Sequence, residues 1–405
     1  MKVRHAIGLA VAACLLGAGA ARAFPPKLSA SGVLDFAYGD QVTASGAQAT
    51  AYKPESKLFY TDDDRWWAVL GAGSGVHLYQ LVNHDWEVTR DFPGADPWAK
   101  ADTLLDGDTL YVSLRDNRSV SGNPRVSTLY TLTYLGDGSW SAPSGPTTIT
   151  TGNPETLTIA RDSTGRLWTT YESSLRINVG STAPGGTAFT FATLPTSDVN
   201  SDDISAITAF GTATSGYKIG VFWSDQAAQR DWFAWRRDDD PIASSSWHIE
   251  TAYGGGVGGC SKLCADDHVN IKVNGDTLYV GVKTSLNDPA SPNPDDPLIV
   301  LLRRSASGAW SAFPVSPVSQ GATRPVVLLA PASDRIWVFA ARSSTEDVWE
   351  SSLSSPGFSS GAFATWTKGA VNSTSTKQLI TSTSGAVVET SASGHEEYWH
   401  NEFLP

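Results

Sequence analysis

One short phrase recurs seven times along the chain, and this repetition constrains the fold more than any other feature. The copies read "DDRWWAVL", "DGDTLYVSL", "STGRLWTTY", "SGYKIGVFW", "NGDTLYVGV", "ASDRIWVFA" and "TSGAVVETS". Their alignment puts seven residues in one column, at intervals of 44, 57, 53, 58, 58 and 50: Trp67, Tyr111, Trp168, Val221, Tyr279, Trp337 and Val387. A period of about fifty residues indicates a repeat architecture.

Each phrase reads as the second of four short antiparallel strands. An apolar strand precedes it and two more follow, the last often carrying tryptophan, and no long helical period appears. This pattern predicts an all-β fold, a seven-bladed β-propeller formed by residues 24–405 as a single domain. The last repeat has only three strands, so we expect "GVLDFAYG" near the N-terminus to supply the fourth and close the ring.

The N-terminus has the composition of a secretory signal. "MKVRHAIGLAVAACLLGAGAARAFPP" combines a basic start, a short apolar run and a small-residue site before Phe24. We therefore expect residues 1–23 to be a signal peptide and the protein to be secreted or periplasmic. The run is too short to span a bilayer, and it continues past Cys14, which disfavours a lipoprotein cleavage site there.

The net charge and the cysteines restrict which molecules this protein can bind and which bonds it forms. The formal net charge of −12 becomes −15 when the signal takes away Lys2, Arg4 and Arg22. This excludes a nucleic-acid partner bound through a general positive field. Cys260 and Cys264 are predicted to form a disulfide in an oxidising compartment, because no second cysteine pair accompanies them to make a metal site. We expect a monomer that does not insert into membranes.

The alternating direction of strands within a blade predicts two unlike faces. Turns from first to second and from third to fourth strands share one face, where they are short and acidic and form a solvated rim. Second-to-third loops and crossings between blades share the other face, where the long loops lie. Because the strands are fixed by packing, we expect binding on the second face.

Polar residues should converge at the channel mouth of that second face. Those opening the innermost strands are Lys57, Lys100, Glu155, Asp203, His268, Arg324 and Lys377, and those at the ends of second strands are Arg115, Tyr171, Asp225, Lys283, Arg342 and His395. Asn270 and Lys272 continue down the wall from His268. The alternative is that the cations merely pair with nearby acids: Asp102, Asp202, Asp266 and Asp267.

Two sets of segments carry a family resemblance. "RDSTGRLW", residues 161–168, resembles the Asp-box turn of sialidase-type propellers, which is a structural turn. "DDHVNIK", "VKTS", "TRPVVLL", "TSTKQ" and "YWHN" resemble secreted bacterial seven-bladed propellers of the ulvan lyase and rhamnose–glucuronate lyase type. The resemblance covers the mature chain at the level of fold and implies action on polysaccharides. No catalytic motif matches residue by residue, so it assigns no site residue.

The first functional hypothesis is a polysaccharide lyase that cleaves a uronic-acid glycan by β-elimination. This reaction needs cations on the sugar carboxylate, a base for the adjacent proton and an acid for the leaving oxygen. Arg324 and Lys377 would neutralise the carboxylate, His268 would be the base and Tyr171 the acid. The anionic poly- or oligosaccharide would contact Lys57, Lys100, Arg115, Glu155, Asp203, Asn270, Lys272, Lys283 and Arg342.

Two other hypotheses remain. A glycoside hydrolase, including a sialidase-like one, needs two carboxyl groups across the scissile bond, and Glu155 and Asp203 open adjacent blades. A glycan-binding propeller lectin needs no chemistry, but lectin propellers repeat their pocket and these mouth residues differ between blades. We expect no cofactor, or else a structural calcium ion near Asp203, Asp266 and Asp267. No triad, phosphate loop, dinucleotide or zinc motif stands out.

Overall fold

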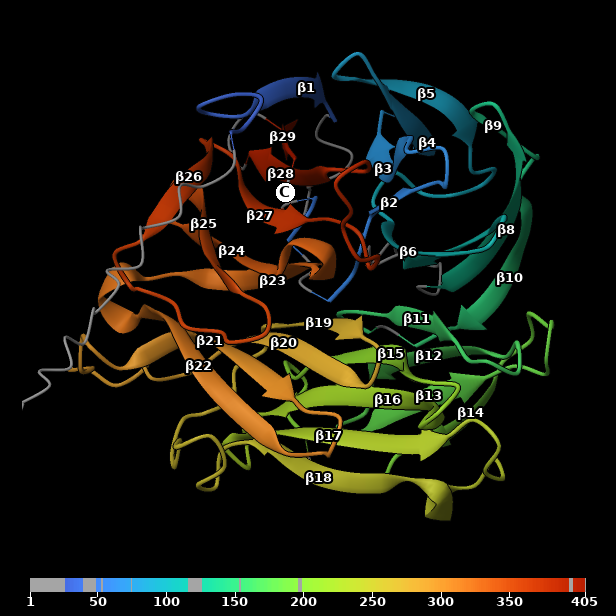
Figure 1. Cartoon of the computed structure of the whole chain (residues 1–405). Coiled ribbons are helices and arrows are strands. Elements are labelled where there is room, and N and C mark those ends of the chain that lie inside the picture. Colours follow the sequence, from blue (N-terminus) through green and yellow to red (C-terminus); the bar gives the residue numbers. More distant parts are fainter. Residues whose placement is uncertain are drawn as a thin grey trace, which may run out of the picture.

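The computed structural model describes residues 26–38, 49–51, 54–73, 75–115, 126–152, 154–195, 199–392 and 396–404. Its strands form seven antiparallel sheets arranged in a ring (Figure 1). The predicted all-β seven-bladed propeller is confirmed. The signal peptide, Cys14 and His395 lie outside the described residues. None of the helices that were described is long and apolar enough to cross a membrane.

Each blade takes its strands in sequence order from the channel outward. Blade 1 contains β2 (Leu58–Tyr60), β3 (Trp66–Ala72), β4 (Gly75–Val82) and β5 (Asp85–Asp91). Blade 2 contains β6 (Lys100–Asp106), β7 (Thr109–Arg115), β8 (Ser127–Gly136) and β10 (Ser144–Thr150), with β9 (Ser139–Trp140) beside β8. Blade 3 contains β11 (Thr158–Arg161), β12 (Leu167–Glu172), β13 (Ile177–Ser181) and β14 (Thr190–Thr193).

Blades 4 to 6 follow the same order. Blade 4 contains β15 (Ser205–Thr212), β16 (Gly216–Asp225), β17 (Arg230–Arg237) and β18 (His248–Tyr253). Blade 5 contains β19 (Val269–Asn274), β20 (Thr277–Lys283), β21 (Pro297–Arg304) and β22 (Trp310–Pro317). Blade 6 contains β23 (Thr323–Ala330), β24 (Arg335–Arg342), β25 (Thr345–Ser352) and β26 (Phe363–Lys368). Short 3₁₀ turns are η2 (Ser244–Ser246), η3 (Val318–Gln320) and η4 (Pro331–Ser333).

Blade 7 closes the ring with strands from both ends of the chain. It contains β27 (Val371–Thr374), β28 (Ala386–Ala392), β29 (Glu397–Phe403) and, at the outer edge, β1 (Val33–Ala37). β1 pairs antiparallel with β29, with Val33 opposite His400. The expectation that "GVLDFAYG" supplies the missing strand is confirmed, and the outer edge of β29 is covered.

The repeated phrase marks the second strand of every blade, as predicted. Its column residues lie on β3, β7, β12, β16, β20, β24 and β28. The large ones pack between blades: Trp67 meets Trp140 of blade 2 with ring centroids 5.5 Å apart in an edge-to-face contact. A fully buried aromatic side chain contributes about 3 kcal/mol, so these tryptophans act as wedges that hold adjacent blades together.

The Asp-box at residues 161–168 forms a structural turn between β11 and β12. Asp162 Oδ1 accepts hydrogen bonds from the backbone N–H groups of Thr164 at 2.9 Å and Arg166 at 3.0 Å. Asp162 Oδ2 accepts one from Trp168 Nε1 at 2.7 Å. One carboxylate therefore fixes both the turn and the wedge tryptophan, and no catalytic role is needed to explain it.

Candidate functional site

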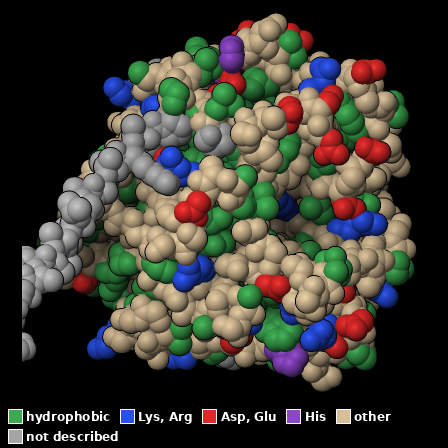
Figure 2. Space-filling view, viewed as in Figure 1, with side chains coloured by type: hydrophobic (Ala, Val, Ile, Leu, Met, Phe, Trp, Pro, Cys, Tyr) green, Lys and Arg blue, Asp and Glu red, His purple; other side chains and the backbone are tan. Residues whose placement is uncertain are grey.

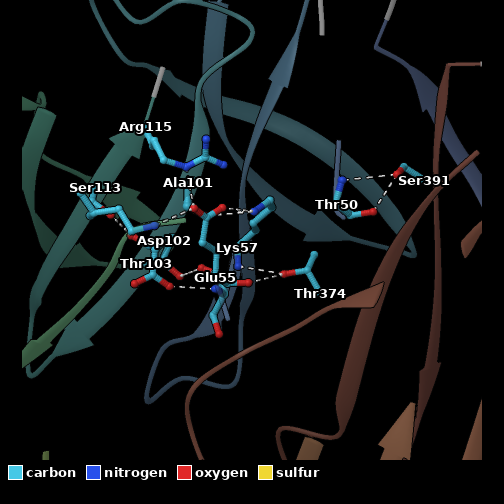
Figure 3. Close-up of polar contacts among 12 residues, drawn as sticks. Thr50, Glu55, Lys57, Ala101, Asp102, Thr103, Ser113, Arg115, Thr374 and Ser391 are labelled. Carbon is cyan, nitrogen blue, oxygen red and sulfur yellow. Dashed lines mark hydrogen bonds and ion pairs between the residues drawn. The ribbon is translucent and has the colours of Figure 1, made fainter. Parts of the chain in front are cut away.

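The mouth is defined here as the end of the channel where the inner strands begin. On the side of blades 1 and 2 its cations are bound by buried carboxylates (Figure 3). Glu55 accepts hydrogen bonds from Lys57 Nζ at 3.3 Å and from Arg115 Nε at 3.0 Å. All three side chains are almost fully buried. The structure therefore places Lys57 and Arg115 in internal ion pairs, with Glu55 as their partner and not one of the four aspartates considered from sequence.

Lys100 lies in the same buried region. Its pKa is lowered to about 7 by burial, and the positive charges of Lys57 and Arg115 lower it further in the same direction. A lysine with a pKa of about 7 is charged in only about half of the molecules at pH 7, so it offers an anionic sugar less positive charge than an ordinary lysine does. This side of the mouth is thus less cationic than the sequence suggests.

Lys377 lies deeper than expected. β27 ends at Thr374, so Lys377 follows the inner strand of blade 7 instead of opening it. Its Nζ crosses the channel to contact the Asp102 carboxylate and the backbone oxygen of Ile159, the latter at 2.7 Å. Asp102 also accepts N–H bonds from Ser56 and Ile159, each at 2.8 Å. This network ties blade 7 to blades 1, 2 and 3, so we do not retain Lys377 as a mouth residue.

Asn270 and Lys272 also connect blades. Asn270 Oδ1 accepts the backbone N–H of Val327 at 3.1 Å, joining β19 to β23. Lys272 Nζ donates to the backbone oxygen of Thr376 at 2.6 Å, and burial, followed by the charge of Lys377, lowers its pKa to about 7. Lys272 and Lys377 border a cavity of about 210 Å³ whose walls are the middle and end portions of the inner strands.

Tyr171 and Arg342 point away from the mouth. The Tyr171 hydroxyl lies 3.1 Å from Thr150 Oγ1 of blade 2, and its ring packs in the apolar cluster between blades 2 and 3. Arg342 Nη1 pairs with Asp347 at 2.8 Å, and its guanidinium lies over the Phe363 ring on the outer part of blade 6. Neither side chain is placed for the role expected from sequence.

His268 is held by carboxylates at the mouth of blade 5. Its Nδ1 pairs with Asp266 and lies 2.5 Å from Asp267 Oδ1, while its Nε2 lies 3.2 Å from Thr323 Oγ1. Asp266 also pairs with Lys283 Nζ. Both imidazole nitrogens are therefore engaged, which leaves His268 without a nitrogen directed at a substrate proton.

Arg324 differs from the other expected cations in the surroundings of its guanidinium. It is partly exposed, and its buried Nε has no hydrogen-bond partner among the described residues. Its φ of 56° places a non-glycine residue in the left-handed region directly before Pro325. Such a conformation costs about 1–3 kcal/mol and is found at ligand-binding positions. Arg324 is adjacent to Thr323, so it lies next to the His268 cluster.

Asp203 is a structural anchor. It is fully buried, and its oxygens bind Ser224 Oγ at 3.0 Å and the backbone N–H groups of Gln226 and Asn200 at 3.1 and 2.7 Å. Burial raises its pKa to about 6, although these hydrogen bonds oppose the shift. Of the three calcium ligands expected from sequence, Asp266 and Asp267 lie with His268 in one group whose ligand atoms are within 4.8 Å of one another, whereas Asp203 belongs to none of the metal-ligand groups among the described residues.

Three other carboxylates meet at the mouth of blades 3, 4 and 5. The ligand oxygens of Glu155, Asp202 and Asp267 all lie within 4.8 Å of one another. Glu155 and Asp267 are partly exposed and Asp202 is exposed. Carboxylates this close repel one another, so the group tends to hold a shared proton or a cation. One carboxyl group can then be protonated while a neighbour stays ionised.

Glu172 joins this side of the mouth and was missed from sequence. It ends β12, and burial raises its pKa to about 7; the negative charges of Asp203 and Glu155 also raise it, against a hydrogen bond from Leu175 N–H. Neighbouring residues of a strand face opposite ways. Tyr171 takes the face toward blade 2, which leaves Glu172 on the face of Thr170, whose hydroxyl contacts Ser205 of blade 4 at 2.9 Å.

The predicted disulfide between Cys260 and Cys264 is confirmed. It closes a loop in the connection between β18 and β19, directly before Asp266, Asp267 and His268. Both sulfur-bearing residues are buried. The bond restrains the segment that carries the carboxylates of blade 5.

No protein-family model and no curated protein matches the chain. Among solved structures it is similar to an α-L-arabinanase of Penicillium chrysogenum, at 12% identity over 82% of this chain and 99% of that one, with a TM-score of 0.45. An α-L-arabinofuranosidase of Fusarium graminearum is 11% identical over 80% of this chain and 98% of that one, with a TM-score of 0.45. Prolyl oligopeptidase B of Galerina marginata is 15% identical over 87% of this chain and 50% of that one, with a TM-score of 0.49. Likenesses this distant carry no argument about activity, and the seven-bladed fold rests on the sheet topology itself.

Proposed function

We propose that the chain is a glycoside hydrolase whose reacting groups lie at the mouth of blades 3, 4 and 5. Hydrolysis of a glycosidic bond uses one protonated carboxyl group and one carboxylate. The gathering of Glu155, Asp202 and Asp267 within 4.8 Å, beside Glu172, carries this proposal. Glu172 would donate the proton to the leaving oxygen, because a carboxyl group with a pKa of about 7 keeps its proton in about half of the molecules at neutral pH, whereas an ordinary glutamate has lost it. A carboxylate of the trio would act as base or nucleophile.

Arg324 is proposed to position the sugar. A planar guanidinium binds a carboxylate or a pair of hydroxyl oxygens through two parallel hydrogen bonds. Arg324 is partly exposed and its Nε is buried, so the terminal nitrogens of the guanidinium would be the donors to the sugar. This feature supports a glycan that carries acidic groups, as the sequence suggested.

The lyase hypothesis has weaker support. β-Elimination needs a base with a free nitrogen or oxygen close to the sugar proton. The nitrogens of His268 are engaged by Asp266, Asp267 and Thr323. Lys377, the second cation of that hypothesis, is bound to Asp102 below the mouth. The disulfide supports action outside the cytoplasm, where such bonds persist.

The test is incubation of the purified chain with a panel of glycans. The panel holds uronate-containing polysaccharides and, because the Penicillium enzyme was solved with arabinobiose, arabinan. New reducing ends without an unsaturated sugar chromophore would support hydrolysis, whereas the chromophore would establish a lyase. Binding without cleavage would establish a lectin. Arg324→Ala should raise KM more than it lowers kcat, since Arg324 is proposed to bind the sugar and not to transfer protons.

A further inference from the structure

Three buried ionisable side chains meet where the N-terminal strand joins blade 7. They are Asp35 on β1, Glu389 on β28 and His400 on β29. Their ligand atoms all lie within 4.8 Å of one another, and their side chains are fully buried. β29 pairs with β1 on one side and β28 on the other, so the cluster spans three neighbouring strands. None of the three takes part in the proposed hydrolysis.

The surrounding contacts turn the unused atoms of the cluster inward. His400 Nε2 lies 3.1 Å from Glu402 Oε1, which leaves Nδ1 facing Asp35 Oδ1 at 2.6 Å. Glu389 Oε2 accepts a hydrogen bond from Trp86 Nε1 at 3.0 Å. The remaining oxygens, Asp35 Oδ2 and Glu389 Oε1, are buried, and no N–H or hydroxyl group among the described residues donates to them, while the two carboxyl groups lie within hydrogen-bond contact of each other.

Carboxyl groups outnumber basic side chains in this cluster. Asp35, Glu389 and Glu402 supply three carboxyl groups, and the basic side chains that contact them are His400, which meets Asp35 and Glu402, and His84, whose Nδ1 lies 2.7 Å from Glu402 Oε1. No described lysine or arginine forms an ion pair with the three carboxyl groups. Buried carboxylates without compensation are strongly unfavourable. The His268 cluster contrasts with this one, because there Lys283 pairs with Asp266.

We propose that Asp35, Glu389 and His400 bind one divalent transition-metal ion, with Zn²⁺ as the expected metal. One imidazole nitrogen and carboxylate oxygens are ligands that Zn²⁺ takes, and two carboxylates with a neutral histidine would balance its charge. A ligating histidine commonly has its second nitrogen held by a carboxylate, which is the position of Glu402. The ion would join the first strand of the ring to the last two.

The first experiment measures metal in the full chain. Elemental analysis after purification in Zn²⁺-containing buffer should find about one ion per chain, and Tm should fall after treatment with a chelator and recover with Zn²⁺ but not with Mg²⁺. Bound Mn²⁺ in the same amount would also support the site. Substoichiometric metal together with a Tm that neither chelator nor Zn²⁺ changes would overturn the proposal and leave a proton shared between Asp35 and Glu389.

A matched pair of variants separates the metal from the proton. Glu389→Gln should abolish stoichiometric Zn²⁺ and the effect of Zn²⁺ on Tm, whereas it should be harmless if the cluster only shares a proton. Glu346→Gln is the control, because Glu346 is a fully buried glutamate of blade 6 that binds Ser373 and Asn372 and belongs to none of the described metal-ligand groups. If Glu389→Gln does not fold, the chelator measurement on the unaltered chain still decides.

Discussion

The two sides of the channel mouth use their charges in opposite ways. On blades 1 and 2, positive side chains are taken up by the protein itself, as Lys57 and Arg115 are by Glu55. On blades 3, 4 and 5, Glu155, Asp202 and Asp267 gather with one another. The difference shows that the sign of a charge near a channel says little about function. What matters is which groups surround the charge: Glu55 meets two cations, whereas on the acidic side carboxyl groups lie close to one another and Asp267 also pairs with His268.

Replacing Glu172 should have the largest effect on activity. Glu172→Gln removes the proposed proton donor, so kcat should fall about 10²–10⁴-fold on whichever glycan is cleaved, while Tm stays unchanged or rises. Tyr171→Phe is the control, because the Tyr171 hydroxyl contacts Thr150 and faces blade 2, away from the carboxyl groups. A near-normal rate for Glu172→Gln would refute its role as the acid.

The carboxyl group of Glu172 should also make the reaction rate depend on pH. The pKa of Glu172 is about 7, so the rate should decline as the pH rises through about 7 and the proton is lost. A rate–pH profile of the unaltered chain measures this limb. A rate that stays constant well above neutral pH would show that Glu172 is not the proton donor.

Replacing Glu55 should cost stability on the opposite side. Glu55→Gln removes the carboxylate that pairs with the buried Lys57 and Arg115 and should lower the free energy of unfolding by about 3–5 kcal/mol, measured by urea denaturation. Asp63→Asn breaks the exposed pair with Arg65 and should cost less than about 1 kcal/mol. Equal effects of the two variants would mean that the basic side is not a structural network.

The disulfide that precedes the carboxylates of blade 5 should contribute less to the free energy of unfolding than Glu55 does. Replacing Cys260 and Cys264 by serine should lower the free energy of unfolding by about 2 kcal/mol, because the bridge closes a very short loop of the unfolded chain. Reductant should lower the Tm of the unaltered chain to a similar extent. The double variant should not respond to reductant, and a response would point to a different cause.

A buried carboxyl group away from the mouth should make the stability of the chain depend on pH. Burial raises the pKa of Glu346 to about 8, so the folded chain keeps a proton that the unfolded chain loses near pH 4.5. Stability should therefore fall between about pH 4.5 and 8, by up to about 1.4 kcal/mol per unit, and stay level above. Unfolding measured across this range should lose that slope in Glu346→Gln. An unchanged slope would show that other groups cause it.

The fold was predictable because its determinants are local and repeated. Strand alternation around Trp67, Trp168 and Trp337 recurs in every blade, so one correct alignment locates all seven second strands. Counting strands was enough to assign the closing role to β1. The Asp162 turn was equally readable, since its partners lie within six residues.

The site was only partly predictable because its partners are remote in sequence. Arg115 lies 60 residues from Glu55, and Lys377 lies 275 from Asp102, so neither pairing could be inferred from spacing. Glu172 was overlooked for a different reason. A shift of one residue along a strand reverses the direction of the side chain, and the sequence does not say which face of β12 meets blade 4.

The pairing of β1 with β29 has a mechanical consequence. Lys27 bridges Phe403, so both ends of the described chain leave the ring side by side. A force applied to the two ends would peel this antiparallel pair apart one hydrogen bond after another, instead of loading all of its bonds together. The disc should therefore open at this join under low tension while the other six blades stay intact.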